Sequence, residues 1–286
     1  MENSGNSKQE LCEKMNSEQN LDKKSRTTIN PYRSAAGLIL SRMRWDLHPY
    51  SWVSRKRIKE WKDKDLGQKA VILCNGPSLN RTNFDELTAS GIFTFGLNKI
   101  NMLFPRSDFR PSVIVAVNSH VIEQAADFYN TTNIPLFLDS AGKKQVRFNK
   151  NVHFLHSAGS GGNFAKDCSI SIRQGSTVTY VAMQLAFHMG FKEVALVGCD
   201  HSFATKGPAY KTVIAGKEDP DHFDPNYFSG GVKWDLPSIA ASTFHYDVAK
   251  DVFESHGREI VNCTEGGKLE VLPRQSLSEF LRKDVG

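Results

Sequence analysis

Residues 174–200 constrain the fold most strongly, because they read as a loop, a helix and a strand that ends on a carboxylate. Apolar residues recur at helical spacing after the loop, so one face of the helix should lie on a sheet; they are Val178, Val181, Ala182, Leu185 and Met189. Before the helix come Gly175, Ser176 and Thr177, which leave backbone N–H groups free and add hydroxyl donors. Such a helix start can bind an anion, although an ordinary Ser or Thr cap explains the same residues.

Short apolar runs alternate with helical patterns through the rest of the chain. The runs predict strands at 69–74, 92–95, 113–117, 136–138, 152–155, 191–200 and 259–262, with helices after the first run, through Tyr129 and at 238–256. Because the runs are apolar throughout, they indicate a mainly parallel sheet with helices on both faces. The sequence therefore predicts an α/β fold whose ligands bind beyond the carboxyl ends of the strands.

Polar turns follow several of these predicted strands. They are Asn75 to Ser78, a turn at 96–98 that ends on Asn98, Asn118 to His120, and Asp200 to Ser202. The first turn, Asn75, Gly76, Pro77 and Ser78, matches neither the GxxxxGK[ST] nor the GxGxxG pattern. It still offers free amides suited to a phosphate or a nucleotide sugar, and a purely structural turn remains the alternative.

The chain divides by composition into three parts. Residues 1–30 are polar and should be disordered, residues 31–68 form a basic aromatic arm and linker, and residues 69–286 form the α/β domain. Between residues 31 and 66 there are nine Lys or Arg and four Asp or Glu, a difference of +5 that equals the net charge of the chain. An anionic membrane surface would suit this arm, and a solvated helical arm packed on the domain is the alternative. Residues 203–234 lose all regular pattern, as expected of a lid.

Composition also limits the cellular setting and the partners. No run of about 18 apolar residues occurs, and the first 30 residues are polar, so we expect a cytoplasmic protein. The odd number and wide spacing of the cysteines support neither a disulfide framework nor a zinc site; they are Cys12, Cys74, Cys168, Cys199 and Cys263. We expect no nucleic-acid partner.

Four segments together resemble a known superfamily: residues 75–79, 175–180, 190–194 and 198–201. The combination is similar to archaeal 6-hydroxymethylpterin diphosphokinase-like proteins, which include the flagellin-modifying motility accessory factors. Their core resembles the bacterial sialyltransferases of the Campylobacter lipooligosaccharide type. The resemblance covers roughly residues 69–277 and implies a Rossmann-like nucleotide-binding catalytic domain, a GT-A-like variant with a lid insertion.

The sialyltransferase resemblance implies a glycosyltransferase that builds or modifies a cell-surface glycan. Its donor would be a CMP-linked, sialic-acid-like sugar, its acceptor a glycan or glycolipid, and it would need no metal. The implied donor-binding residues are Asn75, Gly76, Pro77, Ser78, Asn98, Asn118, Gly175, Ser176 and Thr177. The lid tyrosines Tyr210 and Tyr227 would stabilise the departing phosphate. His222 in the lid would be the base, with His201, directly after Asp200, as the second candidate.

The diphosphokinase resemblance implies a different reaction. ATP would donate a pyrophosphoryl group to a pterin alcohol, with Mg²⁺ held by Asp200 and by Asp221 or Asp224 from the lid. Lys206 and Lys211 could then neutralise the phosphates. A non-catalytic nucleotide-binding protein is the third hypothesis. We favour the glycosyltransferase, acting at the inner face of the cytoplasmic membrane, because a pterin kinase has no need of a basic aromatic arm.

Overall fold

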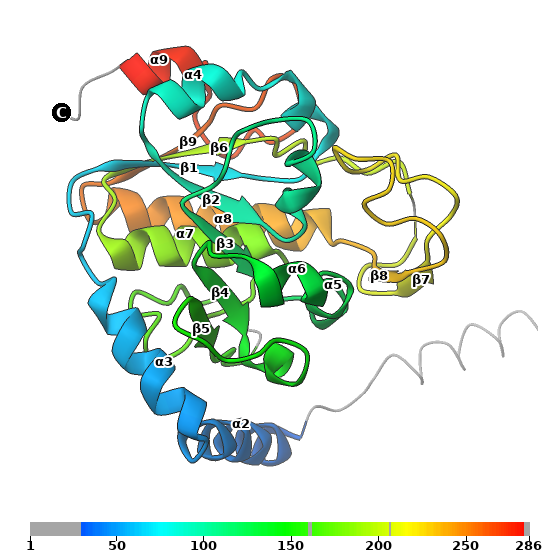
Figure 1. The fold of residues 1–286 in the computed structure, drawn as a ribbon. Helices are drawn as coiled ribbons and strands as arrows, with labels where there is room; N and C mark the ends of the chain where they lie inside the picture. The colour runs from blue at the N-terminus through cyan, green and yellow to red at the C-terminus, as the bar shows by residue number, and fades with distance from the viewer. Residues whose placement is uncertain (1–29, 160–161, 206, 283–286) are drawn as a thin grey trace, which may run out of the picture. The chain divides into compact units, whose positions relative to one another are not determined.

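The computed structural model describes residues 30–159, 162–205 and 207–282 (Figure 1). The disorder predicted for residues 1–30 concerns a segment that lies, up to residue 29, outside the described residues. The chain divides between Met43 and Arg44 into two units.

The second unit is built on a parallel sheet. Its strands are β1 (Lys69–Leu73), β2 (Phe93–Leu97), β3 (Val113–Ala116), β4 (Leu136–Asp139), β5 (Val152–Leu155), β6 (Glu193–Val197) and β9 (Glu259–Asn262). They lie in the order β5-β4-β3-β2-β1-β6-β9, and every neighbouring pair is parallel. The predicted α/β class and parallel sheet are therefore confirmed.

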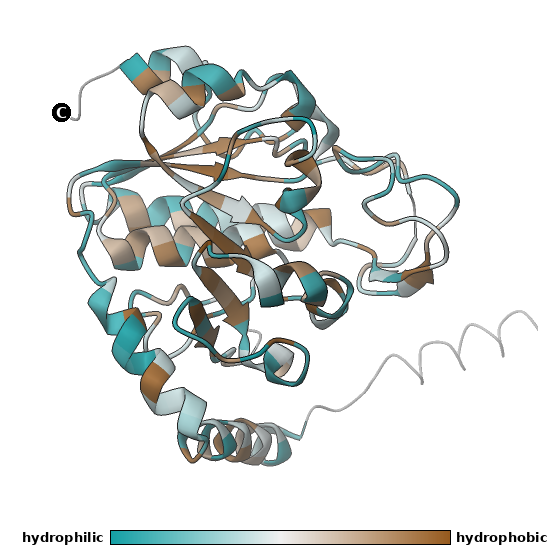
Figure 2. Cartoon of the chain, in the orientation of Figure 1, coloured by the Kyte–Doolittle hydropathy of each residue, from teal (hydrophilic) through white to brown (hydrophobic). Residues whose placement is uncertain are grey.

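Helices cover both faces of this sheet, which explains why most of its strand residues are apolar (Figures 1 and 2). Ala70 and Ile72 of β1 pack in one core with α7 (Val178–Met189) and α8 (Ile239–Glu254). Val71 and Leu73 pack in the other core, with residues of α4 (Phe84–Ala89), α5 (Ser119–Gln124), α6 (Ala126–Thr131) and α9 (Leu277–Arg282). Successive strand residues face opposite cores, so both sets must be apolar. Short 3₁₀ helices complete this unit: η1 (Pro77–Arg81), η2 (Ile100–Leu103) and η3 (Ser140–Lys144).

Two local predictions were wrong. Gly96 and Leu97 belong to β2 and not to a turn. A Cβ on Gly96 would lie 2.7 Å from Cγ2 of Ile100, so the glycine marks a close approach of neighbouring segments. The helix predicted through Tyr129 is two short helices, α5 and α6, that meet at Ala125.

The basic aromatic arm is helical, with α2 (Pro31–Asp46) followed by α3 (Pro49–Glu60). Pro49 is the first residue of α3, where its missing N–H is not needed. In the second unit α3 covers the edge strand β5, because the hydroxyl of Ser54 accepts a hydrogen bond from Phe154 N at 3.1 Å and Ile58 is buried in the core. Segment 62–68 is fixed too, since Asp63 N donates to the carbonyl of His188 at 3.0 Å. No helix among the described residues is both long and apolar enough to cross a membrane.

Several residues of the predicted lid, 203–234, are buried in the hydrophobic core. The lid contributes the antiparallel strands β7 (Thr212–Ile214) and β8 (Lys233–Asp235), and Lys206 lies outside the described residues. Phe223 and Tyr227 are fully buried, and Phe223 N donates to the carbonyl of Asn75 at 2.9 Å. This middle part of the lid is therefore bound to the body of the domain, next to the loop after β1.

Candidate functional site

The order of the strands places a ligand site beside β1. Strands β2 to β5 follow on one side of β1, and β6 and β9 lie on the other, so the order reverses between β1 and β6. Ligands of open parallel sheets bind at the carboxyl ends of the strands at such a reversal. The loops after β1 and β6 meet there, and Gly76 N donates a hydrogen bond to the carbonyl of Gly198 at 2.9 Å.

Asp200 joins these two loops. Its Oδ2 accepts a hydrogen bond from Ser78 N at 2.9 Å. A Cβ on Gly76 would lie 2.1 Å from the same oxygen, so only glycine allows this approach. The carboxylate predicted as catalytic or metal-binding therefore has a structural role in closing the loop.

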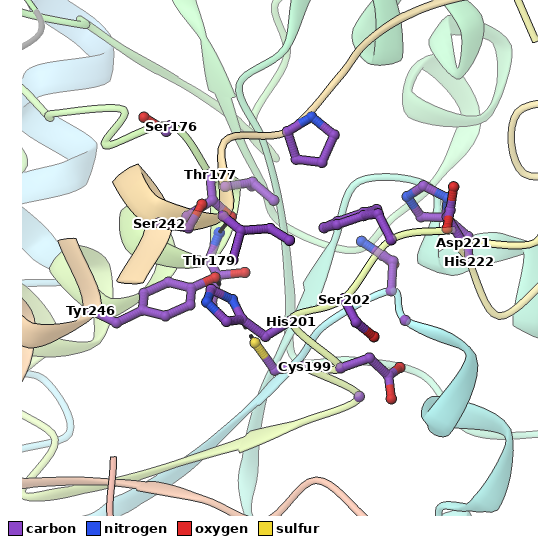
Figure 3. A pocket seen from close by; sticks show the side chains of 18 of the residues that line it. Ser176, Thr177, Thr179, Cys199, His201, Ser202, Asp221, His222, Ser242 and Tyr246 are labelled. Carbon is purple, nitrogen blue, oxygen red and sulfur yellow. Dashed lines mark hydrogen bonds between the residues drawn. The ribbon is translucent and has the colours of Figure 1, made fainter. Parts of the chain in front are cut away.

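Two adjoining lobes of a cavity lie over these loops, and Figure 3 shows the residues that line the first of them. The first lobe, of about 150 Å³, is lined by Asn75, Gly76, Asp200, His201, Ser242 and Tyr246, among others. The second, of about 320 Å³, is lined by Asn118, His120, Gln174, Tyr210, Trp234 and Asp235, among others. Both lobes share Asn98, Ser176, Thr177 and His222. The structure thus brings most of the predicted site residues together at one cavity.

Four of the site residues implied for a glycosyltransferase do not line either lobe: Pro77, Ser78, Gly175 and Tyr227. Pro77 begins η1, and Ser78 contributes its backbone amide to Asp200. Gly175 has φ of +54°, and a Cβ there would lie 2.1 Å from the ring of Tyr180. Pro77, Ser78 and Gly175 therefore support the loops that line the cavity without lining it themselves.

The start of α7 serves both as a cap and as part of the cavity wall. Thr177 is the N-cap, and its hydroxyl accepts a hydrogen bond from Thr179 N at 3.3 Å. Ser176 is not needed for capping, and its hydroxyl lies 2.6 Å from the hydroxyl of Tyr210 in the lid. Two hydroxyl groups, one of them from the lid, therefore meet beside the positive end of α7, an arrangement that suits a phosphate oxygen.

Two amide oxygens at the cavity lack a hydrogen-bond partner among the described residues: Asn75 Oδ1 and Asn98 Oδ1. Asn75 is only 9% exposed. A buried acceptor without a donor is costly, which makes each such group a candidate contact for a ligand. Hydroxyl or amino groups of a nucleoside would supply the missing donors. Asn118, in contrast, uses its Oδ1 to cap α5, where it accepts from His120 N at 2.8 Å.

His222 is held by a carboxylate that the sequence analysis missed. Its Nδ1 lies 2.7 Å from Oδ2 of Asp219, which also accepts from Phe228 N at 3.0 Å. Burial alone would raise the pKa of the Asp219 carboxyl, but the hydrogen bonds from His222 and from the amides of Asp221 and Phe228 hold this pKa below its ordinary value. Asp219 is therefore ionised, His222 donates from Nδ1, and Nε2 is left for a ligand.

Tyr227 supports His222 instead of lining the cavity. The two rings are stacked, with centroids 4.2 Å apart and an interplanar angle of 1°. Burial raises the pKa of the Tyr227 hydroxyl, which accepts a hydrogen bond from Lys99 N at 3.4 Å. This placement differs from the predicted contact with a departing phosphate, whereas Tyr210 does reach the cavity.

His201 lies in the first lobe in a defined tautomer. Thr243 donates its hydroxyl hydrogen to the carbonyl of Ile239 at 2.9 Å, so it accepts from Nε2 of His201 at 2.7 Å. Burial lowers the pKa of His201, which keeps the ring neutral. Its Nδ1 therefore carries a lone pair, and His201 remains chemically able to accept a proton.

The acidic residues do not fit a carboxylate-held Mg²⁺. Asp221 accepts hydrogen bonds from Ala204 N and Thr205 N, and Asp224 lies 3.8 Å from Arg106. Within the described ranges no group of three or more His, Cys, Asp or Glu is arranged to hold a metal ion. Cys74, Cys168, Cys199 and Cys263 are buried and free, and Cys12 lies outside the described residues.

Comparisons with known proteins place the chain in a family. Curated protein sequences give no match. A solved structure, of a MAf glycosyltransferase from Magnetospirillum magneticum AMB-1, aligns with a TM-score of 0.49 and 15% identity over 80% of this chain. The alignment covers 38% of that protein, so this chain spans well under half of its length. The sequence model of the 6-hydroxymethylpterin diphosphokinase MptE-like family matches residues 50–206, more than half of the chain. The chain therefore belongs to the MptE-like family.

Proposed function

We propose that the chain is a glycosyltransferase that moves a sugar from a nucleotide donor, favoured as a CMP-linked sialic-acid-like sugar, to a hydroxyl of a glycan or glycolipid. The observation that carries the proposal is the Asp219–His222 pair beside the two-lobed cavity. Such a transfer needs a base for the acceptor hydroxyl and hydrogen-bond donors for the departing phosphate. His222 is the candidate base, and the hydroxyls of Ser176 and Tyr210 are the candidate donors to the phosphate.

The first lobe would hold the nucleotide. The buried acceptors Asn75 Oδ1 and Asn98 Oδ1 suit the amino and hydroxyl groups of a nucleoside. The hydroxyls of Ser176 and Tyr210, with the start of α7, would donate to the phosphate oxygens. As the glycosidic bond to the phosphate breaks, negative charge grows on this phosphate, and these donors stabilise it.

The second lobe would hold the acceptor. His222 lines both lobes, so its Nε2 can reach an acceptor hydroxyl next to the donor sugar. Nε2 would take the hydroxyl proton while the hydroxyl oxygen bonds to the anomeric carbon and the nucleotide phosphate leaves with the bonding electron pair. The buried carboxylate of Asp219 would stabilise the imidazolium that forms and fix the ring. Asp219 is thus a positioning residue, and His201 is the alternative base.

A second candidate function is pyrophosphoryl transfer from ATP to a pterin alcohol, because the matching family is described by that activity. This reaction uses Mg²⁺ to bridge the phosphates. The carboxylates at the cavity are already engaged with backbone amides, as Asp200 is with Ser78 and Asp221 is with Ala204, which favours the glycosyltransferase. A non-catalytic nucleotide-binding role is the third hypothesis.

Nucleotide binding separates these hypotheses. We expect CMP at about a hundred times its Kd to raise the melting temperature by roughly 5–10 °C in EDTA, because binding to the folded state alone stabilises it. Asn75→Ala should reduce this shift, and Asn226→Ala, on an exposed turn, should not. Differential scanning fluorimetry with CMP, UDP, ATP and GTP measures it. Stabilisation by ATP with Mg²⁺ and not by CMP would support the diphosphokinase, and no response to any nucleotide would contradict both enzymes.

His222 should act on turnover and not on donor binding. We expect His222→Gln, which can still donate to Asp219, to lower kcat about 10²–10⁴-fold while KM for the donor changes little. Steady-state kinetics of His201→Gln provide the matched control. If His201→Gln loses kcat and His222→Gln does not, the base is His201, and if both lose only donor affinity, neither is the base.

The Asp219 carboxylate should stabilise the fold in a pH-dependent way. Because its folded pKa lies below the unfolded value of about 4, its contribution is complete above that pH and is lost as the pH falls through the folded pKa. Asp219→Asn should therefore lower the free energy of unfolding by about 1–3 kcal/mol at pH 7 and by less at pH 3. Urea denaturation of the variant, beside the exposed control Asp108→Asn, measures the difference. A loss that is equal at both pH values would contradict the ionised pair.

A further inference from the structure

Helix α2 carries an exposed apolar stripe. At about 100° per residue, Tyr32, Ala36, Ile39, Leu40 and Met43 share one face of the helix. Tyr32 is 84% exposed, Ile39 59% and Met43 53%. Large apolar side chains that gather on an exposed face mark an interaction site more often than single exposed ones do.

Arginines flank this stripe. Arg33 and Arg44 follow one border of it along the helix, and Arg42 lies beyond the other border. No Asp or Glu occurs in α2 before Asp46, its last residue. Ser34 and Ser41 lie on the opposite face, with Leu38, which is 50% exposed, beside them. Apolar side chains between cations, with small polar groups behind, are typical of helices that lie in the interface of an anionic membrane.

The charges decide between a membrane and a second copy of the chain. Pairing two α2 helices through the stripe would bring Arg33 and Arg44 of both copies together without any acidic partner on the helix before Asp46. An anionic lipid surface supplies the missing negative charge over the whole length of the helix. The family match begins at residue 50, so α2 lies outside the part of the chain that the family shares.

We propose that α2 binds an anionic phospholipid surface, with Tyr32, Ile39, Leu40 and Met43 in the interface and Arg33 and Arg44 on the headgroup phosphates. This binding is separate from the proposed transfer reaction, because it uses none of the cavity residues. The 16-residue helix lies along the interface and presents its serines to water.

Flotation of the full chain with vesicles tests this proposal. We expect binding to phosphatidylcholine mixed with phosphatidylglycerol, little binding to phosphatidylcholine alone, and weaker binding at high salt. Ile39→Gln combined with Met43→Gln should abolish flotation, and Arg33→Gln should weaken binding about fivefold. The control, Ser34→Gln combined with Ser41→Gln on the opposite face, should float like the unchanged chain. Point variants are needed because truncation at residue 67 would also remove α3, which covers β5.

Three results would overturn the proposal: no flotation with anionic vesicles, equal flotation with neutral vesicles, or binding that survives the Ile39 and Met43 substitutions. A dimer in light scattering that the same substitutions dissolve, without vesicle binding, would identify a second copy as the occupant. Turnover with a soluble acceptor should be unchanged in the Ile39 and Met43 variant, so failure of lipid binding and failure of the transferase proposal are distinguishable.

Discussion

The contact between Gly76 and the carboxylate of Asp200 determines the geometry of the whole site. Ser78 N donates to Oδ2 of Asp200, and the missing Cβ of Gly76 leaves the space that this oxygen occupies. The loops after β1 and β6 can therefore approach each other where the strand order reverses. Without this approach, Asn75 on one loop and His201 on the other would not face the same cavity.

The lid is fixed to the domain where chemistry would need rigidity. Lys99 Nζ donates to the carbonyl of Tyr227 at 2.5 Å, and Asn80 Nδ2 donates to the carbonyl of Phe223 at 2.8 Å. Burial lowers the pKa of Lys99 to about 8, because this part of the lid packs over its side chain. Tyr227 in turn supports His222 through ring stacking. Tyr210, which follows the first part of the lid, is 58% exposed, so adjustment to a ligand is easier there.

The sequence predicted the sheet well because its strands are buried on both faces and therefore contain continuous apolar runs, as in 70–73 and 113–116. The polar turns after the predicted strands identified much of the cavity, including Asn75, Asn98 and His201. Asp219 escaped notice because the lid has no periodic pattern, and the pairing of a carboxylate with a histidine three residues later depends on the turn between them. The burial of Tyr227 could not be predicted either, since a tyrosine in a polar loop is expected to be exposed. Gly96 read as a turn because a glycine needed for close packing looks the same in sequence.

The central claim is that the cavity between the loops after β1 and β6 binds the nucleotide of a sugar donor. A crystal structure of the protein with CMP tests it most directly. The account predicts the nucleoside beside Asn75 and Asn98 and the phosphate at the start of α7, within reach of the hydroxyls of Ser176 and Tyr210. A nucleotide bound elsewhere, for example in the cavity lined by Lys69, Ser90 and Phe191 at the other end of the strands, would contradict it.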